Sequence, residues 1–99
     1  MKIGATYTKN WLIAEYMTET FTDSQEKEIP DELTGEETIY EKVKLHAQCA
    51  TIVWKRMLQA GFITKEKYKQ EVTILKQAVE DAAAVVETKT GKIVGTKIF

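Results

Sequence analysis

His46 and Cys49 are the pair of side chains whose types and spacing come closest to a metal site or a nucleophile–base pair. They stand three residues apart in a predicted helix, so their side chains are neighbours on its surface. An imidazole and a thiolate can share a metal ion or act as base and nucleophile. A zinc site needs two further ligands, and the sequence has no other histidine or cysteine. Because both residues fall among apolar positions, we favour a packed or half-buried role and expect no metal or cofactor.

Acidic residues are concentrated between Glu15 and Glu41, where ten acids accompany one base, Lys27. Carboxylates can ligate divalent cations, but the segment lacks a calcium-loop pattern, so a solvated acidic surface is the favoured interpretation. A surface of this kind can still dock on a basic protein surface, because opposite charges speed association. The expected partner-binding residues are Glu26, Glu28, Asp31, Glu32, Glu36 and Glu37.

Basic residues dominate the next segment, Lys42 to Lys76, where eight bases accompany two acids. Several of them are expected to meet at one end of a helical hairpin, near Trp54 and Phe62. Basic residues beside aromatic rings can bind phosphates and stack bases. Because no known nucleic-acid-binding motif is present, a solvated basic face is favoured over a nucleic-acid site. The candidate nucleic-acid-binding residues are Lys55, Arg56, Lys65, Lys67 and Lys69.

The common catalytic motifs are not found in the sequence. It contains no GxGxxG, GxxxxGK[ST], GxSxG or HExxH pattern, and its five glycines are scattered as turn residues. No set of nucleophile, base and orienting residue can be assembled from it. We therefore expect a protein that is not an enzyme.

Length and composition indicate one small globular domain, residues 1–99. The net charge of −1 hides the uneven distribution of acids and bases along the chain. The single cysteine excludes an intramolecular disulfide and fits a reducing compartment. No apolar run approaches the ~18 residues that span a membrane, and the first residues lack the apolar core of a signal peptide. These features predict a cytoplasmic protein without a membrane contact.

The elements that must position these residues begin with a pair of strands in residues 1–22. Residues 2–8 alternate between apolar and polar types, and Lys9–Asn10 can turn the chain. Residues 11–22 are favoured as the second strand, with a helix capped by Asn10 as the alternative. Residues 23–35 are polar and contain the only proline, which predicts a mobile acidic loop.

Two long helices are predicted in the second half, at residues 36–60 and 64–87. The first is apolar on most sides and should be the central buried element, while the second has one clean apolar stripe. Gly61 ends the first helix and Thr64 caps the second, so the pair forms an antiparallel hairpin. Residues 92–99 are β-prone and form either a third strand or a frayed tail. The expected fold is α+β, with a small antiparallel sheet packed on this two-helix hairpin.

The turn between the helices resembles that of SHOCT-type short domains. Residues 58–69 (LQAGFITKEKYK) contain a glycine, an isoleucine–threonine pair, an acid and an aromatic residue in the order of that family. The matching positions are Gly61, Ile63, Thr64, Glu66 and Tyr68. The first helix is longer and more apolar here than in the family, and no function is carried over. In size, composition and layout the whole chain is similar to small uncharacterised proteins of bacteriophages and mobile elements.

Three functions are compatible with these features. The first is a small binding protein that acts by protein–protein contact through its acidic loop, as a phage-type modulator or inhibitor of a host protein. The second is an accessory nucleic-acid binder that uses the basic end of the helical hairpin. The third is a structural subunit that self-assembles, as a homodimer, through the apolar first helix. We favour the first, because the acidic bias is the more extreme.

Overall fold

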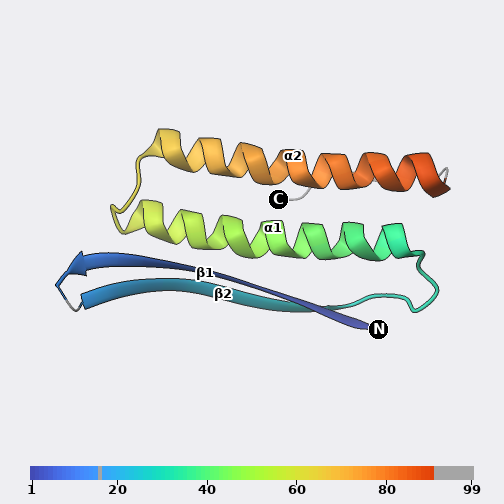
Figure 1. Cartoon of the computed structure of the whole chain (residues 1–99), viewed down its shortest axis with the longest axis horizontal. Coiled ribbons are helices and arrows are strands. Elements are labelled where there is room, and N and C mark those ends of the chain that lie inside the picture. The colour runs from blue at the N-terminus through green and yellow to red at the C-terminus, as the bar shows by residue number, and fades with distance from the viewer. Residues whose placement is uncertain (16, 91–99) are drawn as a thin grey trace.

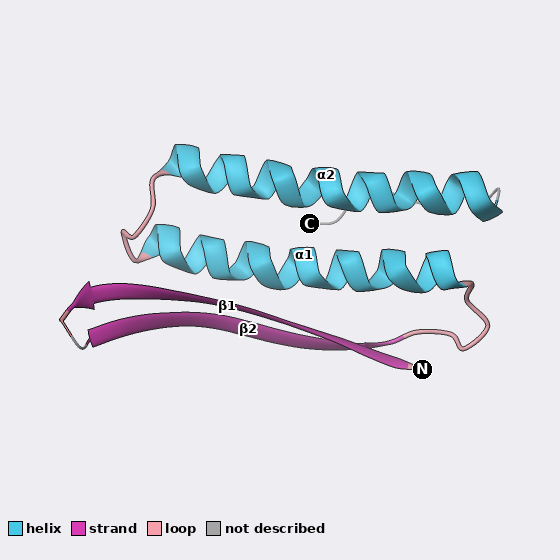
Figure 2. Ribbon diagram, in the orientation of Figure 1, coloured by secondary structure: helices cyan, strands magenta, loops and turns pink. Residues whose placement is uncertain are grey.

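The computed structural model describes residues 1–15 and 17–90, and its elements form three stacked layers (Figure 1). A two-stranded antiparallel sheet forms one layer, the first helix lies on it, and the second helix lies on the first (Figure 2). The body is elongated, with extents of 51 × 28 × 17 Å. The elements are β1 (Lys2–Ala14), β2 (Met17–Glu28), α1 (Gly35–Gln59) and α2 (Lys65–Thr90). The predicted α+β class, with its antiparallel sheet and helical hairpin, is confirmed.

The strands are longer than the sequence pattern predicted. β1 continues through Lys9 and Asn10, which pair with Phe21 and Thr20, so the turn expected there is wrong. The helical alternative for residues 11–22 is excluded by the same pairing. β2 also includes residues 23–28, which were expected in the acidic loop, and the loop is reduced to residues 29–34. Burial alternates along β1 as far as Trp11 and along β2 from Phe21 to Gln25, but several of these half-buried positions carry polar side chains, so the sequence does not show the alternation.

The two faces of the β-sheet differ in chemistry, which is why only one of them packs on α1. Apolar side chains of one face, such as Ile3, Tyr7 and Trp11, point towards α1. The other face is exposed and carries cross-strand hydrogen bonds between polar side chains. These join Thr6 to Ser24 at 2.9 Å, Thr8 to Thr22 at 3.0 Å and Asn10 to Thr20 at 2.8 Å.

α1 begins at a complete capping box. The backbone N–H of Glu37 donates to the Thr34 hydroxyl at 3.1 Å, and the Thr34 N–H donates to the Glu37 carboxylate at 3.3 Å. These bonds satisfy backbone donors that the first turn leaves without helical partners. The helix then buries residues on two sides, against the sheet and against α2, which confirms its predicted central position. Ile39 is an exception among the apolar residues of α1, since 59% of its surface is exposed.

The connection to α2 follows the predicted turn chemistry. Gly61 has a φ of 84°, a left-handed conformation that glycine adopts without steric cost. The hydroxyl of Thr64 accepts from the N–H of Lys67 at 3.2 Å and so caps α2. Within the described chain, the backbone of α2 approaches α1 and neither strand, so the sheet meets the two-helix hairpin through α1. The expectation for residues 92–99 lies outside the described residues.

The core is divided between the two interfaces of α1. On the α2 side, Tyr40 and Ala47 pack with Val79, Ala83 and Val86. On the sheet side, a second cluster of buried α1 residues contacts both the β-hairpin and the α1–α2 turn. Its buried members are Ala50, Val53, Trp54 and Met57, and the side chains packed against them include Tyr7, Trp11, Phe21 and Phe62. A smaller cluster of Ile3, Ile29 and Leu45 closes the other end of the sheet.

Candidate functional site

Cys49 and His46 both lie on α1 but differ in their exposure to solvent. Cys49 is completely buried, as expected, and its thiol donates to the carbonyl of Ala5 at 3.5 Å. Burial raises the pKa of the Cys49 thiol, and the neighbouring Asp23 carboxylate raises it further. His46 is exposed, contrary to its predicted place in the apolar stripe, and its ring meets the Tyr7 ring edge-on at 5.7 Å. An unreactive thiol beside an exposed imidazole does not make a nucleophile–base pair.

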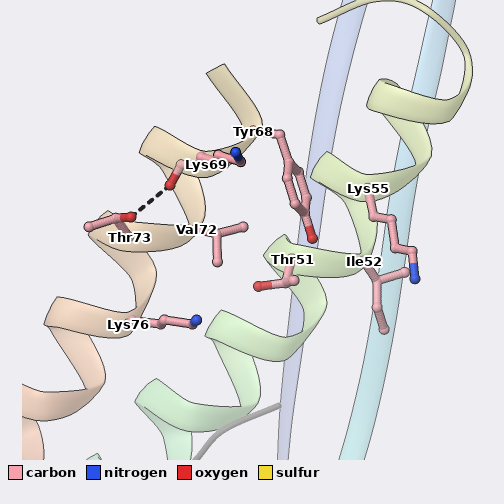
Figure 3. Close-up of a pocket in the computed structure, with 8 residues that line it drawn as sticks. All are labelled: Thr51, Ile52, Lys55, Tyr68, Lys69, Val72, Thr73 and Lys76. Carbon is pink, nitrogen blue, oxygen red and sulfur yellow. Dashed lines mark hydrogen bonds between the residues drawn. The ribbon is translucent and has the colours of Figure 1, made fainter. Parts of the chain in front are cut away.

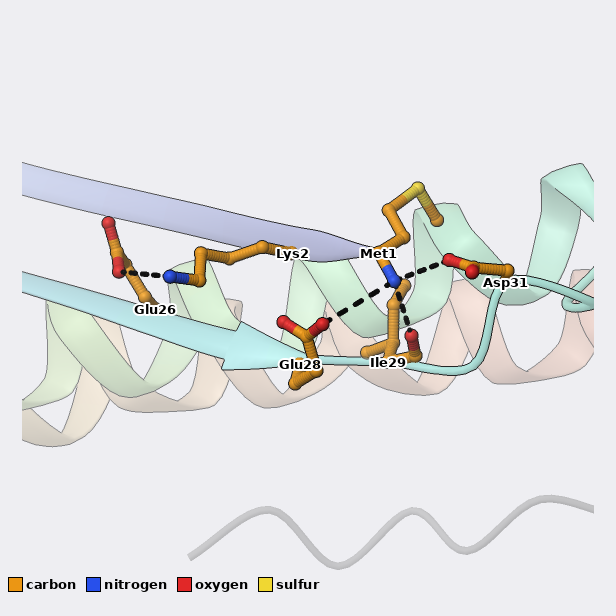
Figure 4. A network of polar contacts seen from close by, with 6 residues as sticks. All are labelled: Met1, Lys2, Glu26, Glu28, Ile29 and Asp31. Carbon is orange, nitrogen blue, oxygen red and sulfur yellow. Dashed lines mark hydrogen bonds and ion pairs between the residues drawn. The ribbon is translucent and has the colours of Figure 1, made fainter.

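The acidic residues at the start of the predicted partner-binding set contact the chain's own amino terminus (Figure 4). The Met1 ammonium bonds the Asp31 carboxylate and lies 3.7 Å from Glu28. It also donates to the Ile29 carbonyl at 3.0 Å. Lys2 lies 3.6 Å from Glu26 on the neighbouring strand. Glu26 and Glu28 therefore lie on a strand, where the sequence predicted a loop, and Asp31 lies in the loop that follows it.

The other acids of the set lie at the beginning of α1 or just before it. Glu37 belongs to the capping box, whereas Glu32 and Glu36 make no ion pair with a described residue. Glu41, one turn further on, pairs with Lys27 at 2.6 Å and with Lys44 at 3.3 Å. Partial burial pushes the pKa of Glu41 up, but the two ammonium groups outweigh it and hold the pKa below its usual range. The acids thus gather at the end of the body where α1 starts (Figure 1).

The predicted nucleic-acid-binding residues lie near the opposite end, where α1 finishes and α2 starts. Two of them bind other residues of the chain. Arg56 donates to the Thr22 carbonyl at 2.8 Å and lies 3.8 Å from Asp23, while Lys67 pairs with Glu71 at 3.0 Å. Lys67 and Lys9 also lie over the Trp54 ring, at 6.0 and 5.6 Å from its centroid. Arg56 therefore contacts β2 from α1, and Lys67 contacts Trp54 of α1 from α2.

Lys55 and Lys69 instead line a groove between α1 and α2, together with Lys76 (Figure 3). The groove has a volume of about 640 Å³, and its lining contains no acidic residue. Lys76 is a groove residue that the sequence reasoning did not place among the candidates. Its signal was available, because positions 69, 73 and 76 share one face of a helix. The full lining is Thr51, Ile52, Lys55, Tyr68, Lys69, Val72, Thr73 and Lys76.

The tip of the β-hairpin is a second surface that the sequence reasoning missed. The β-hairpin extends beyond the α1–α2 turn (Figure 1), and three large apolar side chains near its end are exposed. Leu12 is 76% exposed, Met17 56% and Ile13 49%. Ile13 lies at the register irregularity of the hairpin, between the paired residues Leu12 and Ala14. The overhang could not be predicted while a turn was placed at Lys9–Asn10.

Comparisons with known proteins do not identify the chain. No protein-family model, no curated protein and no solved structure matches it. Residues 1–15 and 17–90 contain no group of three metal-ligating side chains placed to hold an ion. Neither of the two described helices is long and apolar enough to cross a membrane. The similarities to SHOCT-type domains and to phage proteins stay predictions.

Proposed function

We propose that the protein is a small non-enzymatic binding protein that acts by contact with a protein partner, as a modulator or inhibitor of that partner. The observation that carries the proposal is the apolar tip of the hairpin, formed by Leu12, Ile13 and Met17. Exposed apolar patches on monomeric proteins mark interaction sites, and these three exposed residues all fall within positions 12–17. Two long paired strands hold the tip in place, so binding it costs little conformational entropy.

The charges around the tip indicate the chemistry of the partner surface. Glu15 and Glu19 lie beside the apolar side chains and make no ion pair with a described residue. An apolar pocket with a basic rim would complement this arrangement. Glu32 and Glu36, at the far end of the body, are the predicted acids that remain available for a second contact. Acidic residues therefore still contribute to the proposed interface, but its main contact is the tip of the β-hairpin and not the acidic loop.

The proposal is tested by removing the apolar tip and comparing the result with a matched change elsewhere. The variant Leu12→Ser/Met17→Ser changes two exposed apolar residues of the tip. The control Ile74→Ser/Val85→Ser changes two residues of α2 with similar exposure. Both variants should fold like the unchanged protein, because surface substitutions typically alter stability by less than about 0.5 kcal/mol. In affinity capture from a lysate, the unchanged protein and the control should retain a specific partner protein, and the tip variant should not.

Two outcomes would contradict the proposal. Equal loss of partners in both variants would indicate general stickiness, and full retention by the tip variant would exclude the tip. The molecular mass in solution, measured by light scattering, tests the alternative that the protein is a self-assembling subunit. A dimer that dissociates in the tip variant would favour the self-assembling subunit.

A further inference from the structure

We propose that the groove between α1 and α2 binds the phosphate group of a phosphate ester through Lys55, Lys69 and Lys76. This inference concerns a different surface from the hairpin tip and does not depend on the proposed protein partner. The ligand chemistry is that of a nucleotide, whose source is either a free mononucleotide or single-stranded nucleic acid.

The charge of the groove is the first observation. Three lysines from two helices line one concave surface without an acidic residue among the lining side chains. Lys55 and Lys69 make no ion pair with a described residue, in contrast to their neighbours Arg56 and Lys67. The positive charge that Lys55 and Lys69 bring to the rim of the groove raises the local concentration of anions. Lysine is also a common binder of phosphate, acting as a point charge.

The rest of the lining indicates that the anion carries a less polar body. Ile52 and Val72 supply apolar surface, and the half-buried Tyr68 ring stands between the two helices (Figure 3). A volume of about 640 Å³ lies within the range of small-ligand pockets. Lysines at the rim with aromatic and apolar groups inside match a phosphate joined to a base or sugar. A bare inorganic anion would leave this surface unused.

A polar group at the base of the groove is the second observation. The Thr51 hydroxyl is closed off from solvent and has no hydrogen-bond partner within the described residues. Figure 3 shows this hydroxyl directed towards α2, on the side where Val72 and Lys76 lie. Buried hydroxyls nearly always have a partner. A small separation of the two helices would let a ligand oxygen supply one.

The test measures binding of three probes by isothermal titration calorimetry at about 50 and 200 mM salt. The probes are adenosine monophosphate, an oligothymidylate of about 15 nucleotides and polyglutamate. The groove variant is Lys55→Gln/Lys69→Gln. The control Lys42→Gln/Lys89→Gln removes the same charge from two exposed lysines outside the groove that make no ion pair with a described residue.

We expect the groove variant to bind a phosphate probe at least about tenfold more weakly than the control does. Binding of adenosine monophosphate would identify a free nucleotide as the source, and binding of the oligonucleotide alone would identify nucleic acid. Circular dichroism of both variants should match the unchanged protein, which excludes unfolding as the cause. The proposal would be overturned if both variants weakened binding of the phosphate probes equally, or if the protein bound polyglutamate as tightly as it binds those probes. It would also be overturned if neither phosphate probe bound.

Discussion

The indole N–H of Trp11 donates to the sulfur of Met57 at 2.7 Å, which joins the far part of the hairpin to the last turn of α1. Met57 is completely buried, and its side chain is among the largest in the core. Thioethers fill irregular space beside aromatic rings and accept weak hydrogen bonds. Beyond Trp11, the next residues of β1, Leu12 and Ile13, are exposed to solvent.

Met57→Ala is therefore expected to destabilise the protein by about 2–5 kcal/mol, because it leaves a cavity between the sheet and α1. Met57→Leu preserves the volume and should cost less than about 1.5 kcal/mol. Unfolding in urea, followed by tryptophan fluorescence, measures both changes. The exposed Met17 supplies the control, since Met17→Ala should change the free energy of unfolding by less than about 0.5 kcal/mol. Equal effects at the two methionines would contradict the packing.

Cys49 is expected to react slowly with thiol reagents in the native protein. It is buried, and its raised pKa keeps the thiol protonated at neutral pH, whereas the thiolate is the reactive form. Labelling should become fast in denaturant. Cys49→Ser should lower the free energy of unfolding by about 1–3 kcal/mol, because a hydroxyl replaces a small apolar group in the core. Rapid labelling under native conditions would show that the α1–sheet interface opens.

The pairing of Glu41 with Lys27 and Lys44 predicts a specific dependence of stability on pH. The folded-state pKa of Glu41 is lowered, so the folded protein binds this proton less readily than the unfolded chain does. The stabilisation is present above the ordinary pKa of a glutamate and is lost as the pH falls through the folded-state pKa. Glu41→Gln should cost up to about 1 kcal/mol at pH 7. In strong acid the variant and the unchanged protein should unfold alike.

Glu32→Gln is the matched control for that experiment. Glu32 is exposed and makes no ion pair with a described residue, so its substitution should not alter the pH dependence. Thermal unfolding recorded from neutral to strongly acidic pH separates the two variants. A constant difference between Glu41→Gln and the unchanged protein at all pH values would assign the effect to packing or helix propensity.

The helices could be predicted from the sequence because their signals are local. The spacing of apolar residues, the Thr34 and Thr64 caps and the left-handed Gly61 depend on a few neighbouring positions. The burial of Cys49 followed from the same periodicity. The exposure of His46 did not, because a helix packed on two sides still leaves one strip to solvent, and periodicity alone does not locate it.

The hairpin boundaries and the candidate surfaces depend on contacts between distant residues. Lys9 and Asn10 have turn-forming types, yet pairing with Phe21 and Thr20 holds them in the sheet. The acids Glu28 and Asp31 are drawn to the Met1 ammonium, a partner about thirty positions away in the chain. Local propensity could not anticipate that pairing, and so the sequence reasoning predicted a mobile loop. The lysine groove likewise required the relative placement of the two helices.

Replacement of Thr51 by valine is expected to stabilise the protein. The Thr51 hydroxyl is buried without a partner among the described residues, and burial of an unsatisfied hydroxyl costs about 1–3 kcal/mol. Valine has the same shape and removes the polar group, so Thr51→Val should raise the free energy of unfolding by about 1 kcal/mol. The matched control is Thr73→Val on the facing helix. The Thr73 hydroxyl is exposed and donates to the Lys69 carbonyl at 2.7 Å, so its loss should be nearly neutral. If Thr51→Val instead lowers the stability while Thr73→Val does not, an ordered water already bonds the Thr51 hydroxyl in the free protein.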